Sequence, residues 1–175
     1  MIKKRVKNLI KLLNIRNLDG YIIPKNDAYF SEYSSPDRLK IITNFSGSAG
    51  FAIILKNKNY LFVDGRYTIQ AEKESGKYFK IMEMTKFSPE DISKKNNKKL
   101  SLGFDPQLFT SSNLKRKFNN FFNLCEVTEN LVDKIYRDNT KKNIEQFYVL
   151  DSKISGEKTS SKINKLIKKM KYQNL

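Results

Sequence analysis

The chain contains no histidine and only one cysteine, Cys125, and these two absences remove several kinds of active site. Without histidine, the chain cannot build a Ser-His-Asp triad, a Cys-His pair or a histidine-ligated metal site from its own residues. A single cysteine excludes an internal disulfide bond, which fits a reducing compartment such as the cytoplasm. Cys125 lies in an apolar stretch and is expected to be a small buried hydrophobic side chain. The sequence does not exclude a metal site built only from carboxylates.

Long hydrophobic runs are also missing. No apolar stretch of the sequence comes near the about 20 residues that a membrane-spanning helix needs. The first residues, MIKKRVKNLIKLLNIRN, are basic and apolar, but lysines interrupt them, and they lack the continuous apolar centre and the small-residue cleavage site of a secretory signal. Because their apolar positions recur at helical spacing, residues 2–13 are predicted to form an amphipathic helix.

Acidic residues are few relative to basic ones. The sequence has 34 Lys and Arg against 18 Asp and Glu, a net charge of +16, which would attract nucleic acid or anionic lipid. The alternative is that abundant Lys and Asn reflect the codon usage of an A+T-rich genome, since lysines are scattered along the chain, with clusters at 3–7, 94–99 and 162–171. A nucleic-acid role requires the charge to gather on one face of the fold.

Hydrophobic residues make up 39% of the 175-residue chain, which is enough to build a buried core. Short runs of β-forming residues alternate with helical patterns and predict an α/β fold, a mixed β-sheet flanked by helices. The expected strands are 21–24, 51–56, 60–63, 78–84, 99–105 and 123–127, the second and third forming a hairpin. Further helices are expected at 66–75, near 89–95, and from Thr110 or Ser111 through Phe118.

The character of the sequence changes after Val127. The segment that begins at Glu129 has few periodic apolar positions and is expected to be an extended connection. Helical spacing returns at the end of the chain and predicts a helix over residues 160–171, with an apolar face made of Ile163, Leu166, Ile167 and Met170. A helix of about 12 residues is only marginally stable alone, so this one is expected to need a surface to pack on, in the first domain or beyond this chain.

The stretch LFVDGRYTIQ, residues 61–70, places the end of a strand directly before a helix, a junction at which α/β proteins often build sites. Asp64 is the expected helix N-cap and Gly65 the expected turn. The guanidinium of Arg66 could hold a carboxylate through two hydrogen bonds. The alternative is a structural ion pair with Asp64 or Glu32.

The sequence gives weaker evidence for other functional sites. The SGSAG run at 46–50 precedes a strand rather than a helix, which favours a tight turn or close packing over phosphate binding. Aromatic residues interleaved with lysine, in KYFKIMEM and KRKFNNFF, could stack nucleic-acid bases, but their strand and helix spacing favours the core. The carboxylates Asp64, Glu72, Glu74, Glu83, Asp91 and Asp105 are scattered, and no spacing forces two of them together for acid–base work.

Five motifs, taken in order, resemble the amino-terminal domain of the Xaa-Pro aminopeptidases (aminopeptidase P) of the creatinase/prolidase superfamily, and the three-domain form fits best. The motifs are YIIPKNDAYFSEY (21–33), the RL…FSGSAG run (38–50), DGRYTIQA (64–71), LGFDPQLFT (102–110) and ENLVDKIY (129–136). Two positions depart from the family pattern. Tyr29 stands where the family often has histidine, and Phe62-Val63 where it often has tryptophan, which affects local packing rather than the fold.

The resemblance implies a creatinase N-terminal α/β domain over 1–136, followed at 137–175 by a linker and the first helix of a truncated second domain. The whole enzyme would remove an amino-terminal residue that precedes proline. It would use two divalent metal ions, manganese, held by aspartates, glutamates and a histidine in a catalytic domain that this chain lacks. The chain itself would carry no cofactor, would be inactive alone, and would help to shape the substrate site and a dimer interface.

The resemblance assigns a role to one residue, because the arginine of DGRY contacts the substrate in the longer enzymes. Arg66 would reach across to a substrate held in another domain, and within this chain its charge is expected to lie idle. The implied partners are the middle and catalytic domains, a peptide with proline at its second position, and a second copy in a homodimer, all in the cytoplasm. The alternatives are a basic nucleic-acid or anion-binding module and a stand-alone interaction domain.

Overall fold

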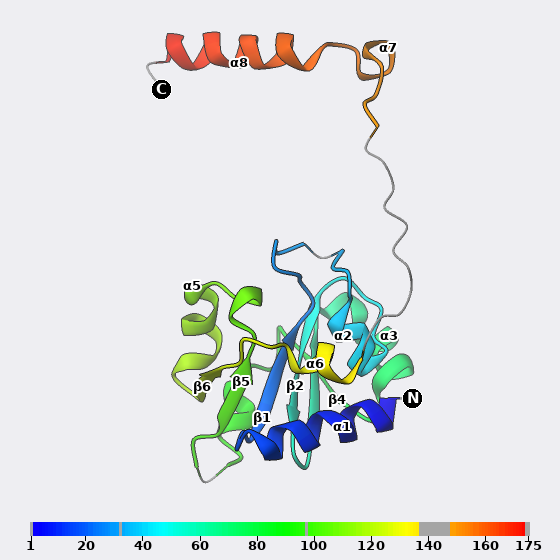
Figure 1. The fold of residues 1–175 in the computed structure, drawn as a ribbon, viewed down its shortest axis with the longest axis vertical. Coiled ribbons are helices and arrows are strands. Elements are labelled where there is room, and N and C mark those ends of the chain that lie inside the picture. The colour runs from blue at the N-terminus through cyan, green and yellow to red at the C-terminus, as the bar shows by residue number, and fades with distance from the viewer. Residues whose placement is uncertain (1, 32, 97, 137–147, 174–175) are drawn as a thin grey trace. The chain divides into compact units, whose positions relative to one another are not determined.

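The computed structural model describes residues 2–31, 33–96, 98–136 and 148–173. The chain divides into two compact units, residues 1–138 and 139–175. In the first unit a six-stranded sheet carries helices on both faces, so the predicted α/β fold with a mixed sheet is confirmed (Figure 1).

The sheet has the order β4-β3-β2-β1-β5-β6. Strand β2 runs antiparallel to both of its neighbours, and every other adjacent pair is parallel. The predicted hairpin is the β2–β3 pair, in which Phe51 lies opposite Phe62. The strands are β1 (Gly20–Pro24), β2 (Gly50–Leu55), β3 (Asn59–Val63), β4 (Lys80–Glu83), β5 (Ser101–Phe104) and β6 (Asn123–Glu126).

Four helices cover one face of the sheet. They are α1 (Ile2–Ile15), α2 (Arg38–Thr43), α3 (Thr68–Ser75) and α6 (Leu131–Ile135). The longest is α1, which buries Ile2, Val6, Leu9 and Leu13, the face that its helical spacing predicts. Together with Tyr21, Ile23 and Phe45 these side chains form the first hydrophobic core.

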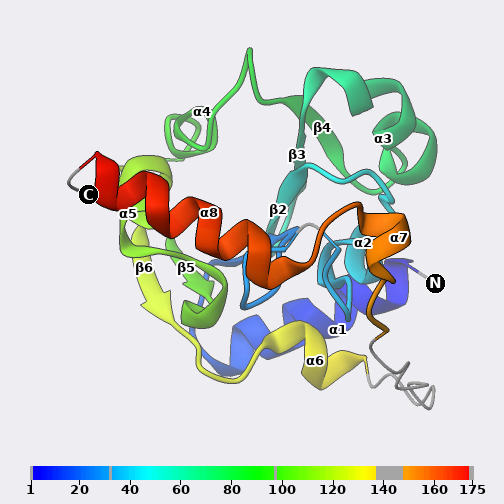
Figure 2. The same cartoon turned by 90° about the horizontal axis from the view of Figure 1, so that it is seen from above.

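The opposite face is covered by α4 (Glu90–Ser93), α5 (Ser111–Leu114) and a π-helix, η3 (Lys115–Asn119). Figure 2 shows α4 and α5 on one side of the sheet and α1 and α6 on the other. Aromatic rings dominate this second core: Phe51 stacks on Phe62, and Phe118 meets Phe51 edge-on at 5.7 Å between ring centroids. The expectation that the aromatic residues of KRKFNNFF pack in the core is confirmed by the burial of Phe118 and Phe122.

Two expectations about secondary structure and burial in the first unit are wrong. The segment after Val127 is not simply extended, because Asn130 caps the short helix α6 and Leu131 and Val132 are fully buried. Five residues are too few for a helical period to be visible in the sequence. Cys125 is only partly buried, because β6 is an edge strand.

The second unit contains α7 (Ser152–Ser155), which also interrupts the predicted connection, and α8 (Thr159–Tyr172), which confirms the predicted terminal helix. No side chain of α8 is buried. Its apolar face, Ile163, Leu166, Ile167 and Met170, is between 41% and 58% exposed. Among the described residues of both units, no helix is long and apolar enough to cross a membrane.

Candidate functional site

Asp64, Arg66 and the SGSAG run, which the sequence singles out, lie at one edge of the sheet. Because β1, β3, β4, β5 and β6 run in one direction, all of them end there, and β2 begins there. We call this the carboxyl edge; it is formed by residues 25–31, 33–37, 44–49, 64–67 and 105–110. The loop that follows β1 projects from it (Figure 1). Open α/β sheets place their ligands at this edge.

Arg66 lies in a turn that its neighbour Asp64 organises. Asp64 Oδ1 accepts a hydrogen bond from the backbone N–H of Arg66 at 2.9 Å and a second from Arg66 Nε at 2.9 Å. The first of these caps a 3₁₀ turn, Gly65–Tyr67, so the predicted N-cap is confirmed. The side-chain hydrogen bond from Arg66, followed by the backbone one, lowers the pKa of the Asp64 carboxyl.

The guanidinium of Arg66 is oriented without being buried. Its side chain is 74% exposed, and its guanidinium carbon lies 5.5 Å from the centroid of the Tyr67 ring. The expectation of an idle charge is therefore wrong, because Arg66 is paired with Asp64, as the alternative interpretation anticipated. The other partner considered, Glu32, lies outside the described residues.

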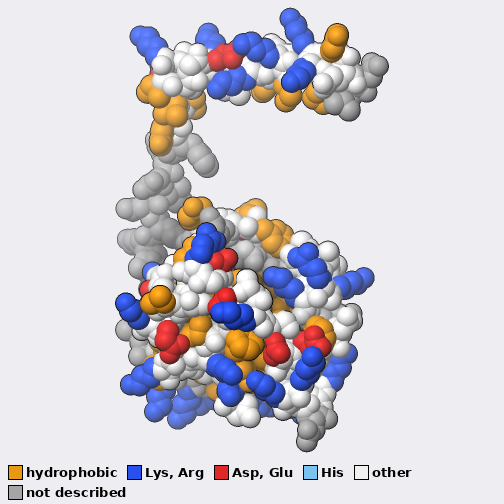
Figure 3. Space-filling model, turned by 180° about the vertical axis from the view of Figure 1, so that it is seen from behind, with side chains coloured by type: hydrophobic (Ala, Val, Ile, Leu, Met, Phe, Trp, Pro, Cys, Tyr) orange, Lys and Arg blue, Asp and Glu red, His pale blue; other side chains and the backbone are white. Residues whose placement is uncertain are grey.

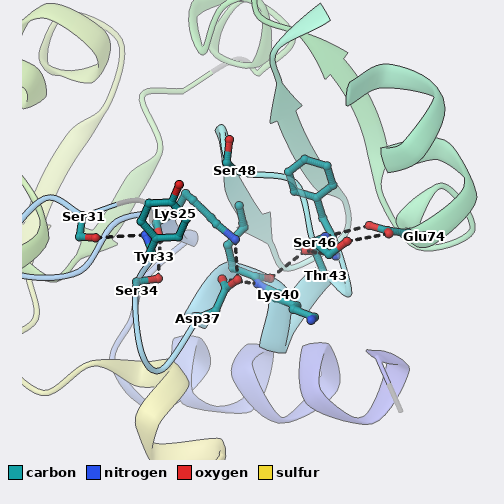
Figure 4. Close-up of polar contacts among 12 residues, drawn as sticks. Lys25, Ser31, Tyr33, Ser34, Asp37, Lys40, Thr43, Ser46, Ser48 and Glu74 are labelled. Carbon is teal, nitrogen blue, oxygen red and sulfur yellow. Dashed lines mark hydrogen bonds and ion pairs between the residues drawn. The ribbon is translucent and has the colours of Figure 1, made fainter. Parts of the chain in front are cut away.

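The SGSAG loop is tied to α3 by a carboxylate. Ser46 donates its backbone N–H to Glu74 Oε2 and its hydroxyl to Glu74 Oε1, both at 2.8 Å (Figure 4). Gln70 Nε2 also donates to Glu74 Oε1, at 3.1 Å. Burial opposes ionisation of Glu74, but these hydrogen bonds outweigh it and lower its pKa. A Cβ on Gly47 would lie 2.3 Å from the Phe45 ring, so close packing explains this glycine. The structural interpretation of SGSAG is confirmed.

The loop that follows β1 is held in a defined shape. Lys25 pairs with Asp37, and both side chains are largely buried (Figure 4). Asp27 Oδ1 accepts hydrogen bonds from the backbone N–H groups of Tyr29 and Ser31, each at 2.9 Å. The result is a loop that turns the ring of Tyr29, 91% exposed, toward solvent. An exposed aromatic side chain on a stiffened loop is a typical contact residue.

Two polar contacts that sequence reasoning missed join the motifs of the family to one another. Arg38 donates to Asp133 through both Nε and Nη2, at 2.9 and 2.8 Å. Asn130 Nδ2 donates to Asp105 Oδ2 at 2.8 Å, and both residues are buried. The only signal in the sequence is that each residue lies within one of the quoted motifs. These contacts connect elements that are far apart in the sequence, so we interpret them as structural.

The carboxylates do not form a metal site or an acid–base pair in the described part of the chain. No three His, Cys, Asp or Glu side chains gather there. Asp64 and Glu83 are neighbours at the carboxyl edge, but each is paired with a cation, Arg66 or Lys86. The pKa of Glu83 is lowered mainly by hydrogen bonds from Lys86 and Thr85. A carboxyl that stays ionised is a poor general acid, and the described residues do not fit a pair of metal ions.

The positive charge of the larger unit is mixed with negative charge on the face that Figure 3 shows, where Asp and Glu side chains lie among those of Lys and Arg. Several cations of this unit are in ion pairs, including Lys94 with Glu90 and Lys98 with Asp19. A nucleic-acid footprint is expected to form a continuous basic patch. This face does not supply one.

Known proteins resemble the chain along nearly its whole length. Residues 5–135 match the Creatinase/Prolidase N-terminal domain family. Aminopeptidase P1 of Lotus japonicus is 32% identical over 161 residues, which is 87% of this chain and 24% of the relative. Xaa-Pro aminopeptidase 1 of Dictyostelium discoideum is 31% identical over 192 residues, 99% of this chain and 30% of the relative. The chain thus spans about a quarter to a third of the length of these relatives.

Solved structures agree with these matches. The X-prolyl aminopeptidase of Caenorhabditis elegans, described as a cytosolic enzyme with a di-nuclear active site, aligns with 99% of this chain at 26% identity and a TM-score of 0.76, over 32% of its own length. The N-terminal domain of the peptidase PepQ from Mycobacterium tuberculosis shares the fold, with a TM-score of 0.58 at 19% identity over 98% of that domain and 76% of this chain. The chain belongs to the creatinase/prolidase N-terminal domain family and corresponds to the amino-terminal region of the Xaa-Pro aminopeptidases.

Proposed function

We propose that this chain is the non-catalytic amino-terminal part of a metal-dependent Xaa-Pro aminopeptidase, where it helps to shape the substrate site and a dimer interface. The observation that carries the proposal is the coverage of the matches. Nearly the whole chain aligns with enzymes of this activity, yet it accounts for only 24% to 32% of their length. A chain without histidine and without a carboxylate cluster in its described part contributes surface and contacts rather than the reaction itself.

In this proposal residues 1–136 are the amino-terminal domain, and 137–175 are a linker and the first helix of a second domain. The partners are the middle and catalytic domains of the enzyme, a second copy in a homodimer, and a peptide with proline at its second position. The two divalent metal ions, manganese, belong to the catalytic domain. The cytosolic location of the related Caenorhabditis elegans enzyme supports a cytoplasmic one here.

Arg66 is the residue proposed to contact the substrate. Its position at the carboxyl edge, its exposure and its orientation by Asp64 support this role. A guanidinium that is always charged and held through Nε offers a directed donor to a carbonyl or carboxylate of a peptide. The exposed Tyr29 lies on the loop that follows β1 at the same edge, so a peptide contact there is supported by more than one side chain.

The first test is an assay of the purified chain. With added Mn²⁺ and a peptide that has proline at its second position, we expect no release of the amino-terminal residue above the rate of a protein-free blank. Metal-dependent turnover by the chain alone, lost on addition of a chelator, would contradict the proposal.

The second test addresses Arg66 in a chimera in which this chain replaces the aligned segment of the Dictyostelium discoideum enzyme. We expect Arg66→Ala to lower kcat/KM at least about tenfold, since a charged hydrogen bond contributes about 1.5–3 kcal/mol. Lys73→Ala, on the neighbouring helix α3, is the matched control and should leave kcat/KM unchanged. Equal activity of the Arg66→Ala and Lys73→Ala chimeras would refute the substrate contact.

A further inference from the structure

At the carboxyl edge, the connections that follow the neighbouring strands β1 and β5 turn to opposite faces of the sheet. Strands β1 and β5 are parallel neighbours. After β1 the chain passes to α2, which packs in the first core, and after β5 it passes through the 3₁₀ turn Pro106–Leu108 to α5 and η3, which pack on the other face. A crevice forms outside the strand ends wherever two adjacent connections diverge in this way, and ligands of open α/β sheets bind in that crevice.

A cavity of about 90 Å³ lies near this point, lined in part by Asn26 after β1, Gly50 and Phe51 at the start of β2, and Asn113 and Lys117 on the helical side. Asn26 Nδ2 donates to the carbonyl of Leu108 at 3.0 Å and so bridges the two diverging connections. A Cβ on Gly50 would lie 2.7 Å from the carbonyl oxygen of Phe62 in the paired strand, so close packing accounts for the glycine beside the cavity.

Lys117 brings a positive charge to the cavity without an acidic partner. Its Nζ lies 5.5 Å from the centroid of the Phe51 ring, and no carboxylate in the described part of the chain forms an ion pair with it. Partial desolvation, and then the neighbouring Arg116, lower the pKa of Lys117. An anion in the cavity would offset both effects. Lys117 belongs to the π-helix η3, and π-helical turns occur frequently at functional sites.

Asn113 adds a polar group to the same wall. Its Oδ1 accepts a hydrogen bond from Arg116 at 3.2 Å, and its Nδ2 group donates no hydrogen bond to another described residue. A cation and an amide N–H₂ group are donors only, while the rings of Phe51 and Phe118 supply apolar walls. The lining therefore suits a ligand that accepts hydrogen bonds at one end and is apolar at the other.

We propose that this cavity binds a small carboxylate, with Lys117 as the counter-ion and Asn113 Nδ2 as a hydrogen-bond donor. The volume is that of about three water molecules, which matches a carboxylate group with one or two further carbon atoms attached. The carboxylate can belong to a free organic acid or to the side chain of an acidic residue of another protein segment. This proposal is separate from the role of Arg66 and does not rest on the proposed function.

The test is a titration of the ¹⁵N-labelled full chain, followed by amide chemical shifts, with sodium acetate at constant ionic strength and pH. We expect saturable shifts at Asn26, Gly50, Phe109 and Asn113. Lys117→Met, which keeps the aliphatic stem over Phe51, should lose them, while Lys115→Met in the same π-helix should retain them. Linear shifts without saturation, or equal saturable shifts in Lys117→Met, would overturn the proposal.

Two further titrations, with phosphate and with a peptide, test which kind of anion the cavity binds. Sodium phosphate in place of acetate should give no saturable shifts at these amides, because phosphate lacks the apolar end, and stronger binding of phosphate would overturn the carboxylate assignment. A short peptide ending in Asp-amide has the Asp side chain as its only carboxylate. Competition of this peptide with acetate indicates that the natural ligand is a protein segment. If acetate binds and the peptide does not compete, the natural ligand is a free organic acid. If Lys117→Met does not fold, Asn113→Ala tests the same cavity and should weaken acetate binding at least about tenfold, because it removes a hydrogen bond to a charged group.

Discussion

Arg38 and Asp133, 95 residues apart in the sequence, form a bidentate ion pair that fastens α2 to α6. The pair lies at the end of the first unit, where the chain leaves the sheet for the last time. Arg38 Nε and Nη2 each meet one carboxylate oxygen, which is the planar geometry that arginine favours. Because the Arg38 side chain is 16% exposed and that of Asp133 is 44% exposed, solvent screens the pair only in part.

We predict that Arg38→Lys destabilises the chain even though the charge is kept. A lysine cannot supply two parallel hydrogen bonds, so the free energy of unfolding should fall by about 1 kcal/mol, and Arg38→Ala should cost about 2 kcal/mol. Urea unfolding followed by circular dichroism measures both. The control is Lys134→Ala in α6, next to Asp133, because the pair of Lys134 with Glu129 is more exposed and should be worth less than about 0.5 kcal/mol. An equal effect of Arg38→Lys and Lys134→Ala would contradict the bidentate role.

A second prediction concerns Asn130, whose side chain makes two hydrogen bonds at the start of α6. Its Oδ1 caps the helix by accepting from the N–H of Val132 at 2.9 Å, and its Nδ2 donates to the buried Asp105. Asn130→Ala removes the cap and leaves a buried carboxylate with one donor fewer, so we expect a loss of about 2–3 kcal/mol in unfolding free energy. Asn120→Ala, at an exposed position, should change it by less than about 0.5 kcal/mol. A neutral result for Asn130→Ala would show that water replaces both bonds.

The Arg38–Asp133 and Asn130–Asp105 contacts could not be predicted from the sequence. The α/β class, the order of the strands along the chain, the amphipathic face of α1 and the cap at Asp64 follow from local spacing and are confirmed by the structure. The Arg38–Asp133 and Asn130–Asp105 pairs depend on where distant segments meet, which no local pattern encodes. Sequence spacing likewise gave no reason to bring Lys117 beside Phe51.

A third prediction follows from the lowered pKa of Glu74. Its ordinary value is 4.5, and in the folded chain hydrogen bonds from Ser46 and Gln70 hold it lower despite burial. The folded state thus binds fewer protons than the unfolded state near this pH. The stabilising contribution is complete above the ordinary pKa and is lost as the pH falls through the folded value. Glu74→Gln should therefore destabilise the chain most at neutral pH and progressively less in acid.

The measurement is urea unfolding between neutral pH and about pH 3, where carboxyl groups titrate. We expect the gap between wild type and Glu74→Gln to narrow as the pH falls below 4.5. Glu126→Gln, on the edge strand β6, is the control, and its difference from wild type should stay small throughout. A gap that widens in acid would mean that Glu74 binds its proton more readily in the folded state, which would overturn the sign of the pKa shift.

The last prediction compares two helices of the same length. Both α1 and α8 have 14 residues and an apolar face, but α1 buries four side chains and α8 buries none. Most helical stability in proteins comes from packing, so α8 alone is marginal. In native-state hydrogen exchange at low protein concentration, we expect the amides of α1 to be protected nearly as well as those of β1 and β2, and the amides of α8 to exchange at least about a hundredfold faster. Protection of α8 that rises with protein concentration would show that its apolar face pairs between copies of the chain, and protection equal to that of α1 at every concentration would contradict the prediction.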